Sequence, residues 1–201
     1  IEDPVPLVRP ATITKATSTF KRCYEHCVKT GKVSIRAVQS QVDNIINDLV
    51  NNSEIMYGMS EVKEYDDYTY EHSVNVCILS LVLGIDQDYS HAQLRSLGIG
   101  SMLHDIGKIA VRSEILEKEE PLDEAKWEEI KRHPDVGYSI LGSANEFNVL
   151  AEIVLAHHER WDGKGYPRGL MGEETPLLSR IIGVAEAYDA MVSERSYRKA
   201  L

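Results

Sequence analysis

The longest apolar run of the chain, 74-VNVCILSLVLGI-85, places the strongest constraint on its fold. The run is too short to cross a bilayer and contains Asn75 and Ser80, so we interpret it as a buried core helix. Elsewhere apolar residues recur with helical periodicity, and the sequence shows neither a clear pair of alternating strands nor an Asn-Gly turn. The sequence therefore predicts an all-α fold, with helices at about 14–29, 34–51, 69–84, 90–104, 123–132, 134–142, 147–158 and 176–192.

Two further segments indicate how the chain is organised. The stretch 61-EVKEYDDYTY-70 is acidic and rich in tyrosine, and it separates two predicted N-terminal helices from the rest, so we expect a soft boundary near 52–66. The longest irregular segment is 159–175, which is rich in glycine and charge. A loop of that length in a compact helical domain is more often functional or disordered than idle.

Charge and cysteine content exclude some classes of function. The net charge of −10 argues against binding to DNA, RNA or anionic membranes, which favour a basic surface. A small anionic substrate stays possible if a local positive centre is present, and a metal ion is the most compact one. No secretory signal is visible, and the three cysteines lack CxxC spacing, so we expect a cytoplasmic protein with buried thiols. Because the chain begins at Ile1, we expect a fragment.

The positions of the histidines are more informative than their number. A single histidine in a helical protein is usually a surface residue or a satisfied core residue. Here five of the seven lie at predicted helix starts or ends, where side chains can converge on one cavity. His26 and His91 lie in polar surroundings and are assigned to the surface. The five at helix ends are His72, His104, His133, His157 and His158.

Adjacent residues on a helix do not share a face, so the pair His157-His158 needs an explanation. At a fraying helix end both side chains can turn toward one centre, especially if two metal ions offer separate positions. A mixed His/Asp set without cysteine suits iron, manganese or zinc. Two such ions can clamp a phosphoester for hydrolysis.

Several motifs occur together in a fixed order between about residues 68 and 201. The central ones are 103-LHDIGKI-109 and 157-HHERWDGKGYPRGL-170. In this combination the sequence strongly resembles the HD-GYP family, the GYP-bearing branch of the HD phosphohydrolases. The motifs that complete the resemblance are 70-YEHSVNV-76, 115-ILEK-118, 133-HPDVG-137 and 180-RIIGVAEAYDAMVSERSYRKA-200.

The resemblance implies a helical bundle of the HD phosphohydrolase type. It divides the chain into a small N-terminal accessory helical region, 1–64, and an HD-GYP catalytic domain, 65–201, which we expect to be truncated at its C-terminus. It further implies hydrolysis of cyclic di-GMP to pGpG, and in some members on to GMP. Two divalent metal ions, most often Fe or Mn, are the implied cofactors.

The resemblance also implies roles for individual residues. Asp105 would bridge two metals, and Lys108 would reach a phosphate oxygen as the second catalytic residue. Asp162 and Asp189 would support the ligands from behind, although Asp189 could also substitute for one. The implied metal ligands are His72, His104, Asp105, His133, His157, His158 and Glu186, and the implied substrate contacts are Lys108, Gly165, Tyr166, Pro167, Arg195 and Arg198.

Two departures from the family pattern bear on the number of metals. Glu186 stands where the family usually has Asp, and Tyr68 stands where some members have a Glu for a third metal. We therefore expect two metals, one held mainly by three histidines and the other, easier to lose, by His72, His104 and Glu186. The three histidines of the first are His133, His157 and His158.

Other readings of the same residues remain open. The substrate could be cyclic GMP-AMP or another phosphoester. A degenerate, non-hydrolytic domain could instead bind the nucleotide and signal to a protein partner, and Glu186 keeps this reading open. Arg195 and Arg198 could be a solvated surface pair. A homodimer or a signalling partner is compatible with all of these readings.

Overall fold

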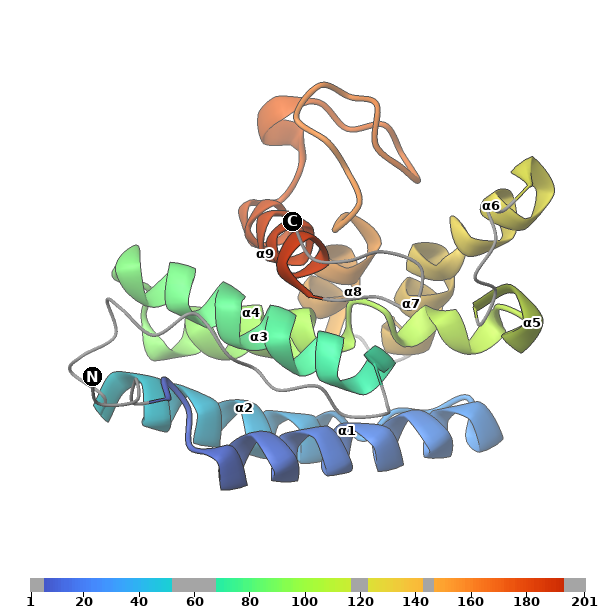
Figure 1. Ribbon diagram of the computed structural model, residues 1–201. Helices are drawn as coiled ribbons and strands as arrows, with labels where there is room; N and C mark the ends of the chain where they lie inside the picture. Colours follow the sequence, from blue (N-terminus) through green and yellow to red (C-terminus); the bar gives the residue numbers. More distant parts are fainter. Residues whose placement is uncertain (1–5, 52–67, 117–122, 143–146, 194–201) are drawn as a thin grey trace.

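The chain folds into an all-α structure, as predicted (Figure 1). The computed structural model describes residues 6–51, 68–116, 123–142 and 147–193. These residues contain no β-strand, only one isolated bridge between Asp162 and Met171. The α-helices are α1 (Pro10–Thr30), α2 (Ile35–Asn51), α3 (Tyr68–Asp86), α4 (His91–Leu103), α5 (Ser113–Leu116), α6 (Glu124–Ile130), α7 (His133–Leu141), α8 (Asn148–Leu155) and α9 (Leu177–Val192), and the 3-10 helices are η1 (Ile106–Ala110) and η3 (Gly172–Glu174).

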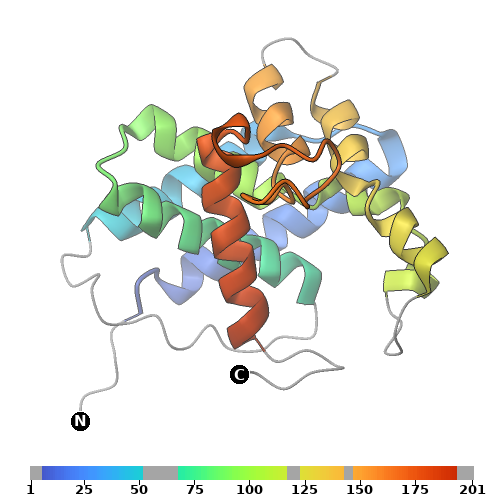
Figure 2. The same ribbon diagram turned by 90° about the horizontal axis from the view of Figure 1, so that it is seen from above.

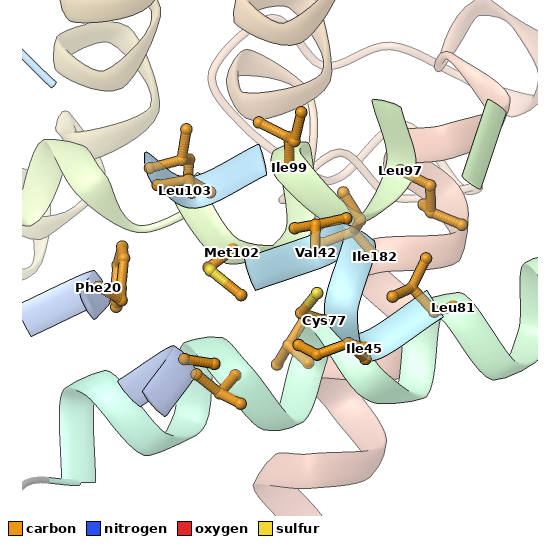
Figure 3. Packing of buried hydrophobic residues seen from close by; sticks show 14 of the residues in the cluster. Phe20, Val42, Ile45, Cys77, Leu81, Leu97, Ile99, Met102, Leu103 and Ile182 are labelled. Carbon is orange, nitrogen blue, oxygen red and sulfur yellow. The ribbon is translucent and has the colours of Figure 1, made fainter. Parts of the chain in front are cut away.

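Helices α1 and α2 form one layer, and α3 and α4 lie on it as a second (Figure 1). Helix α9 crosses the far side of α3 and also contacts α4 and α8 (Figure 2). Large buried side chains fill the space between the layers, each contributing about 1.5–3 kcal/mol through removal of apolar surface from water. Among them are Phe20, Val42, Ile45, Leu81, Leu97, Met102 and Ile182 (Figure 3).

The two N-terminal helices share this core with the rest of the molecule. Val42 and Ile45 of α2 are fully buried in the same cluster as Cys77 of α3 and Leu97 of α4. The expected boundary near 52–66 lies outside the described residues, and the division into 1–64 and 65–201 stays a prediction. The N-terminal helical pair forms the layer against which α3 and α4 pack.

Helix ends follow the sequence signals in some places and not in others. Ser90 and Asp123 cap α4 and α6 through their side chains, as predicted. Helix α1 starts at Pro10, before the expected start at 14, because proline fits the first helical turn. Helix α8 was expected to continue to 158 but ends at Leu155.

Gly84 lies inside α3, which continues two residues beyond it. A Cβ atom at Gly84 would stand 2.9 Å from the Cδ2 atoms of both Leu94 and Leu97. The glycine therefore allows α3 and α4 to approach closely. Among the helices described, none is long and apolar enough to cross a membrane.

Candidate metal centre

Histidine and carboxylate side chains from five parts of the fold converge on one buried site. His72 comes from the first turn of α3, and His104 and Asp105 follow the end of α4. His133 begins α7, and Glu186 comes from α9. His157 and His158 lie in the turn after α8. Two groups have ligand atoms within 4.8 Å of one another, namely Asp105 with His133, His157 and His158, and His72 with His104 and Glu186.

Asp105 faces both groups with different oxygens. Its Oδ1 atom lies 3.2 Å from Nε2 of His133, in the first group. Its Oδ2 atom lies 3.4 Å from Nε2 of His104 and 3.9 Å from Nε2 of His72, in the second group. A carboxylate with one oxygen on each side is positioned to bridge two cations.

Backbone carbonyl groups fix the orientation of three of the rings. Nδ1 of His104 lies 2.6 Å from the carbonyl oxygen of Ser101, and Nδ1 of His133 lies 2.7 Å from that of Ile130. His157 makes the same contact with Val154. Each carbonyl lies three residues earlier, near the end of a helix, where carbonyls lack helical partners. With Nδ1 donating its proton, each ring presents a bare Nε2 lone pair to the site.

The lone pairs and oxygens of the site fit a cation. Nε2 of His133 and Nε2 of His157 are only 3.1 Å apart, although both rings already donate from Nδ1. Nε2 of His104 and Oδ1 of Asp105 are buried without a hydrogen-bond partner. Buried acceptors that face one another without a donor are costly unless a positive charge lies between them. The nitrogen and oxygen donors therefore fit divalent metal ions.

Burial keeps the first group of histidines in the neutral form that binds metals. It lowers the pKa of His133 to about 4 and, with help from His133, that of His158 to about 2. Burial also holds the pKa of His157 well below its usual range. At His104, burial acts in the same direction, but the Asp105 carboxylate outweighs it and raises the pKa.

Carboxylates and a lysine complete the electrostatics. Burial alone would raise the pKa of Asp105, but the Lys108 ammonium and the His104 ring outweigh it and hold the pKa well below its usual range. Nζ of Lys108 lies 2.6 Å from Oδ2 of Asp105, and its side chain is 24% exposed. Burial raises the pKa of Glu186, whose Oε2 lies 3.6 Å from Nδ1 of His158. Glu186 is therefore within reach of both groups.

The Gly165-Tyr166-Pro167 segment packs directly on the first group. The Tyr166 ring stacks on the His158 ring with centroids 4.6 Å apart, and its edge meets His133 at 6.4 Å. A Cβ atom at Gly165 would come within 2.4 Å of the backbone nitrogen of Arg160 and 2.5 Å of the carbonyl oxygen of His158. Only glycine fits so close to the ligand backbone. The Tyr166-Pro167 peptide bond is cis.

Glu159 organises this loop, a role that the sequence reasoning missed. Its side chain is buried, and its two carboxylate oxygens accept hydrogen bonds from the backbone amides of Arg168, at 2.7 Å, and Leu170, at 2.9 Å. The available signal was a carboxylate directly after two ligand histidines in a glycine-rich loop, where backbone amides need acceptors.

The two carboxylates expected to support the ligands differ. Oδ2 of Asp189 lies 2.7 Å from Nδ1 of His72, and Asp189 is buried. Asp189 therefore directs Nε2 of His72 toward the site, as an outer-shell carboxylate does. Asp162 is exposed on the loop and accepts hydrogen bonds from Arg160 and the Lys164 amide. Among the described residues, no hydrogen bond joins the Asp162 side chain to a ligand residue, so its supporting role stays a prediction.

Other predicted positions lie at the surface or outside the described residues. His26 and His91 are exposed, as predicted. Arg195 and Arg198 lie outside the described residues, and so does the side chain of Tyr68. The structure therefore brings together all seven implied metal ligands with Lys108, Tyr166 and Asp189.

Known proteins resemble this chain in sequence. A family model described as HD domain matches residues 44–201. The chain is 37% identical to the cyclic di-GMP phosphodiesterase PA4108 of Pseudomonas aeruginosa over 159 residues, which cover 79% of this chain and 38% of that protein. It is 47% identical to the cyclic di-GMP phosphodiesterase response regulator RpfG of Xanthomonas campestris over 113 residues, 55% of this chain and 30% of that one. A 3'3'-cGAMP-specific phosphodiesterase of Vibrio cholerae is 40% identical over 67% of this chain and 29% of its own length.

A solved structure supports the fold assignment. The HDG"Y"P protein Bd1817 from Bdellovibrio bacteriovorus superposes with a TM-score of 0.72, covering 88% of this chain and 59% of that one, at 18% identity. The chain spans less than two-fifths of the length of the curated relatives named above.

Proposed function

Since this chain belongs to the GYP-bearing branch of the HD domain family, we propose that it is a metal-dependent phosphodiesterase that hydrolyses cyclic di-GMP. The expected product is pGpG, and a second hydrolysis of pGpG would yield GMP. Relatives named as cyclic di-GMP phosphodiesterases support this substrate. The single observation that carries the proposal is Asp105, which presents one oxygen to each of two groups of ligands.

We propose two divalent cations, iron or manganese, as the cofactors. The donors are histidine nitrogens and carboxylate oxygens, while Cys23, Cys27 and Cys77 are buried and free and belong to neither ligand group. When bound, the two ions would polarise a phosphodiester and activate a water molecule for in-line attack on phosphorus.

The chain's own residues position and neutralise the substrate. Lys108 contacts Asp105 and is partly exposed, so its ammonium can turn to a phosphate oxygen as negative charge develops there. Tyr166 covers His158, and Glu159 holds the loop that carries Tyr166 in place. Arg195 and Arg198 are proposed to hold phosphate oxygens, on the strength of the sequence motif alone.

Cyclic GMP-AMP is the second candidate substrate. A relative specific for 3'3'-cGAMP is 40% identical over two-thirds of this chain, a likeness comparable to that of the cyclic di-GMP enzymes. A non-hydrolytic binding domain is disfavoured because the seven proposed metal ligands converge in two groups and Lys108 contacts Asp105 beside them. A cytoplasmic location, a homodimer and a signalling partner stay predictions from the sequence.

The test is a substrate assay with protein purified anaerobically. We expect metal-loaded protein to convert cyclic di-GMP to pGpG, and chelator-stripped protein to regain activity when Fe²⁺ or Mn²⁺ is restored. Elemental analysis of the same samples gives the metal content per chain. Faster turnover of 3'3'-cGAMP would select the second candidate. Full turnover by a metal-free sample, or binding of the nucleotide without hydrolysis by a fully loaded one, would contradict the proposal.

A further inference from the structure

His158 differs from the other two histidines of the first ligand group. The rings of His133 and His157 each donate from Nδ1 to a backbone carbonyl, whereas in the described part of the chain no carbonyl accepts from Nδ1 of His158. That nitrogen faces Oε2 of Glu186, a ligand of the second group, at 3.6 Å, and the His158 side chain is 22% exposed. The direction of the His158 ring therefore depends on a contact from outside its own helix end.

Tyr166 makes that contact in two ways. Its backbone amide donates a hydrogen bond to the carbonyl oxygen of His158 at 3.2 Å. Its ring stacks on the His158 ring, with centroids 4.6 Å apart and planes at 29°. Stacked rings of this kind attract each other beyond the apolar area that they bury. Tyr166 thus holds the backbone and the ring of this ligand at the same time.

Glu159 in turn holds the part of the loop that follows Tyr166. The buried carboxylate accepts hydrogen bonds from the backbone amides of Arg168, at 2.7 Å, and Leu170, at 2.9 Å. These amides lie two and four residues after Tyr166, and Glu159 directly follows His158. An ionised carboxylate can accept from both amides at once, and bonds to an ionised acceptor are stronger than bonds between neutral groups. The loop that leaves the ligand is therefore fastened back to the residue beside it.

We propose that Glu159 is a positioning residue for the metal of the first ligand group, and that it acts through Tyr166 on His158. The inference rests on the proposed metal cofactors but not on the identity of the substrate. Neither Glu159 nor Tyr166 belongs to a ligand group. Weakening this chain of contacts frees the His158 ring to turn away from its ion, while the second group keeps its own supports.

The experiment measures metal affinity in the Glu159→Gln variant of the whole chain. The amide side chain keeps its size but has one acceptor oxygen, so one of the two backbone amides loses its partner. We expect the affinity for the ion of the first group to fall roughly tenfold, at the lower end of the range for residues that support metal ligands, and the other affinity to stay at the parental value. Competition with a chelator for Mn²⁺ gives the two affinities, and anomalous scattering from partly loaded crystals shows which ion is missing.

Glu152→Gln is the matched control, because the same change is made at another carboxylate that binds the same loop residue. Oε2 of Glu152 accepts from the Arg168 side chain at 3.0 Å, whereas Glu159 accepts from the Arg168 backbone. The Glu152 contact lies at the surface and does not fix the backbone that follows Tyr166. We expect both metal affinities of Glu152→Gln to match those of the parent.

Variants of Tyr166 test the second step. Tyr166→Phe keeps the stacked ring and should keep both affinities, whereas Tyr166→Leu removes the ring and should weaken the first ion about as much as Glu159→Gln does, roughly tenfold. Because Glu159 and Tyr166 act on one contact, the double variant Glu159→Gln/Tyr166→Leu should lose little more than either single variant.

The outcomes separate this inference from the proposed function. An unchanged first affinity in Glu159→Gln, or an equal loss at both ions, would mean that Glu159 only supports the fold, and the inference would be wrong. An equal loss in Tyr166→Phe and Tyr166→Leu would overturn the stacking step. Melting temperatures of the metal-free variants show whether each chain is folded, and Tyr166→Leu decides if Glu159→Gln is not. A parent chain that binds no divalent ion would overturn the proposed cofactors, and this inference with them.

Discussion

The two ligand groups of the metal centre are held in different ways. In the first, His133 and His157 are fixed by backbone carbonyls, and His158 lies under the Tyr166 ring. In the second, the His104 ring is also fixed by a backbone carbonyl, but His72 depends on a side chain, that of Asp189. The remaining ligand of the second group is Glu186, whose side chain is 17% exposed and one methylene longer than an aspartate.

This difference indicates which group binds its ion more weakly. A ligand held by the backbone keeps its direction as long as the helix ends stay folded. A long carboxylate must lose side-chain entropy to bind, and a ring oriented by another side chain depends on that side chain being in place. We therefore expect the second group to lose its metal first and to respond to smaller changes.

The largest effect is expected from Asp105→Asn, because Asp105 faces a histidine of each ligand group with a different oxygen. The neutral amide removes the bridging charge, so both metals should be lost or weakened and hydrolysis should fall more than about a hundredfold. Metal content and cyclic di-GMP turnover are the measurements, with the exposed His26→Asn as the control. Full metal content in Asp105→Asn would contradict the bridging role.

A smaller effect, confined to one metal, is expected at Glu186. Glu186→Gln should reduce the metal content from two ions toward one, because a neutral amide is a poorer ligand for a hard cation. Glu186→Asp should hold or raise occupancy and activity, because it restores the shorter side chain usual in the family. Elemental analysis with anomalous scattering from crystals gives the number and position of the ions. Loss of the ion held by His133 instead of the ion held by His72 would show that the first ligand group is the weaker one.

The smallest effect is expected at Asp189, which supports His72 without being placed among the ligands. Asp189→Asn should weaken the metal of the second group roughly tenfold, since outer-shell partners usually contribute a factor of 10–100 in affinity. Competition with a chelator measures the two affinities separately. Ser193→Ala, which removes a 3.2 Å contact from the Ser193 hydroxyl to Asp189, serves as a milder companion variant. Equal weakening of both metals would show that Asp189 acts on the whole fold.

Much of the fold could be predicted because the apolar periodicity is strong. The sequence places helices near α2, α4 and α9 within a residue or two of their ends, and Ser90 marks the start of α4 with a capping side chain. The early end of α8 at Leu155 was missed. Its cause is tertiary, because His157 is directed into the site and takes the Val154 carbonyl for its ring. Helix α3 likewise continues past Gly84, where the missing side chain leaves room for Leu94 and Leu97 of α4.

The site was predictable where ligands repeat a motif and less so where they depend on neighbours. Position at predicted helix ends is by itself enough to indicate the five histidines. The carbonyl partners of their rings and the role of Glu159 depend on contacts that only the folded chain provides. The motif also suggested a supporting role for Asp162, but in the folded chain this residue is exposed and pairs with Arg160.

The origin of the ligands in separate helices has a consequence for stability. Bound ions would act as cross-links between α3, α4, α7, α9 and the turn after α8, whose ligands range along the sequence from His72 to Glu186. Because the unfolded chain cannot assemble these donors, metal affinity adds to folding free energy, by about 2.7 kcal/mol when the free ion is at a hundred times its Kd. The melting temperature would thus report the free metal concentration, and metal limitation would lower the amount of folded protein as well as its rate of turnover.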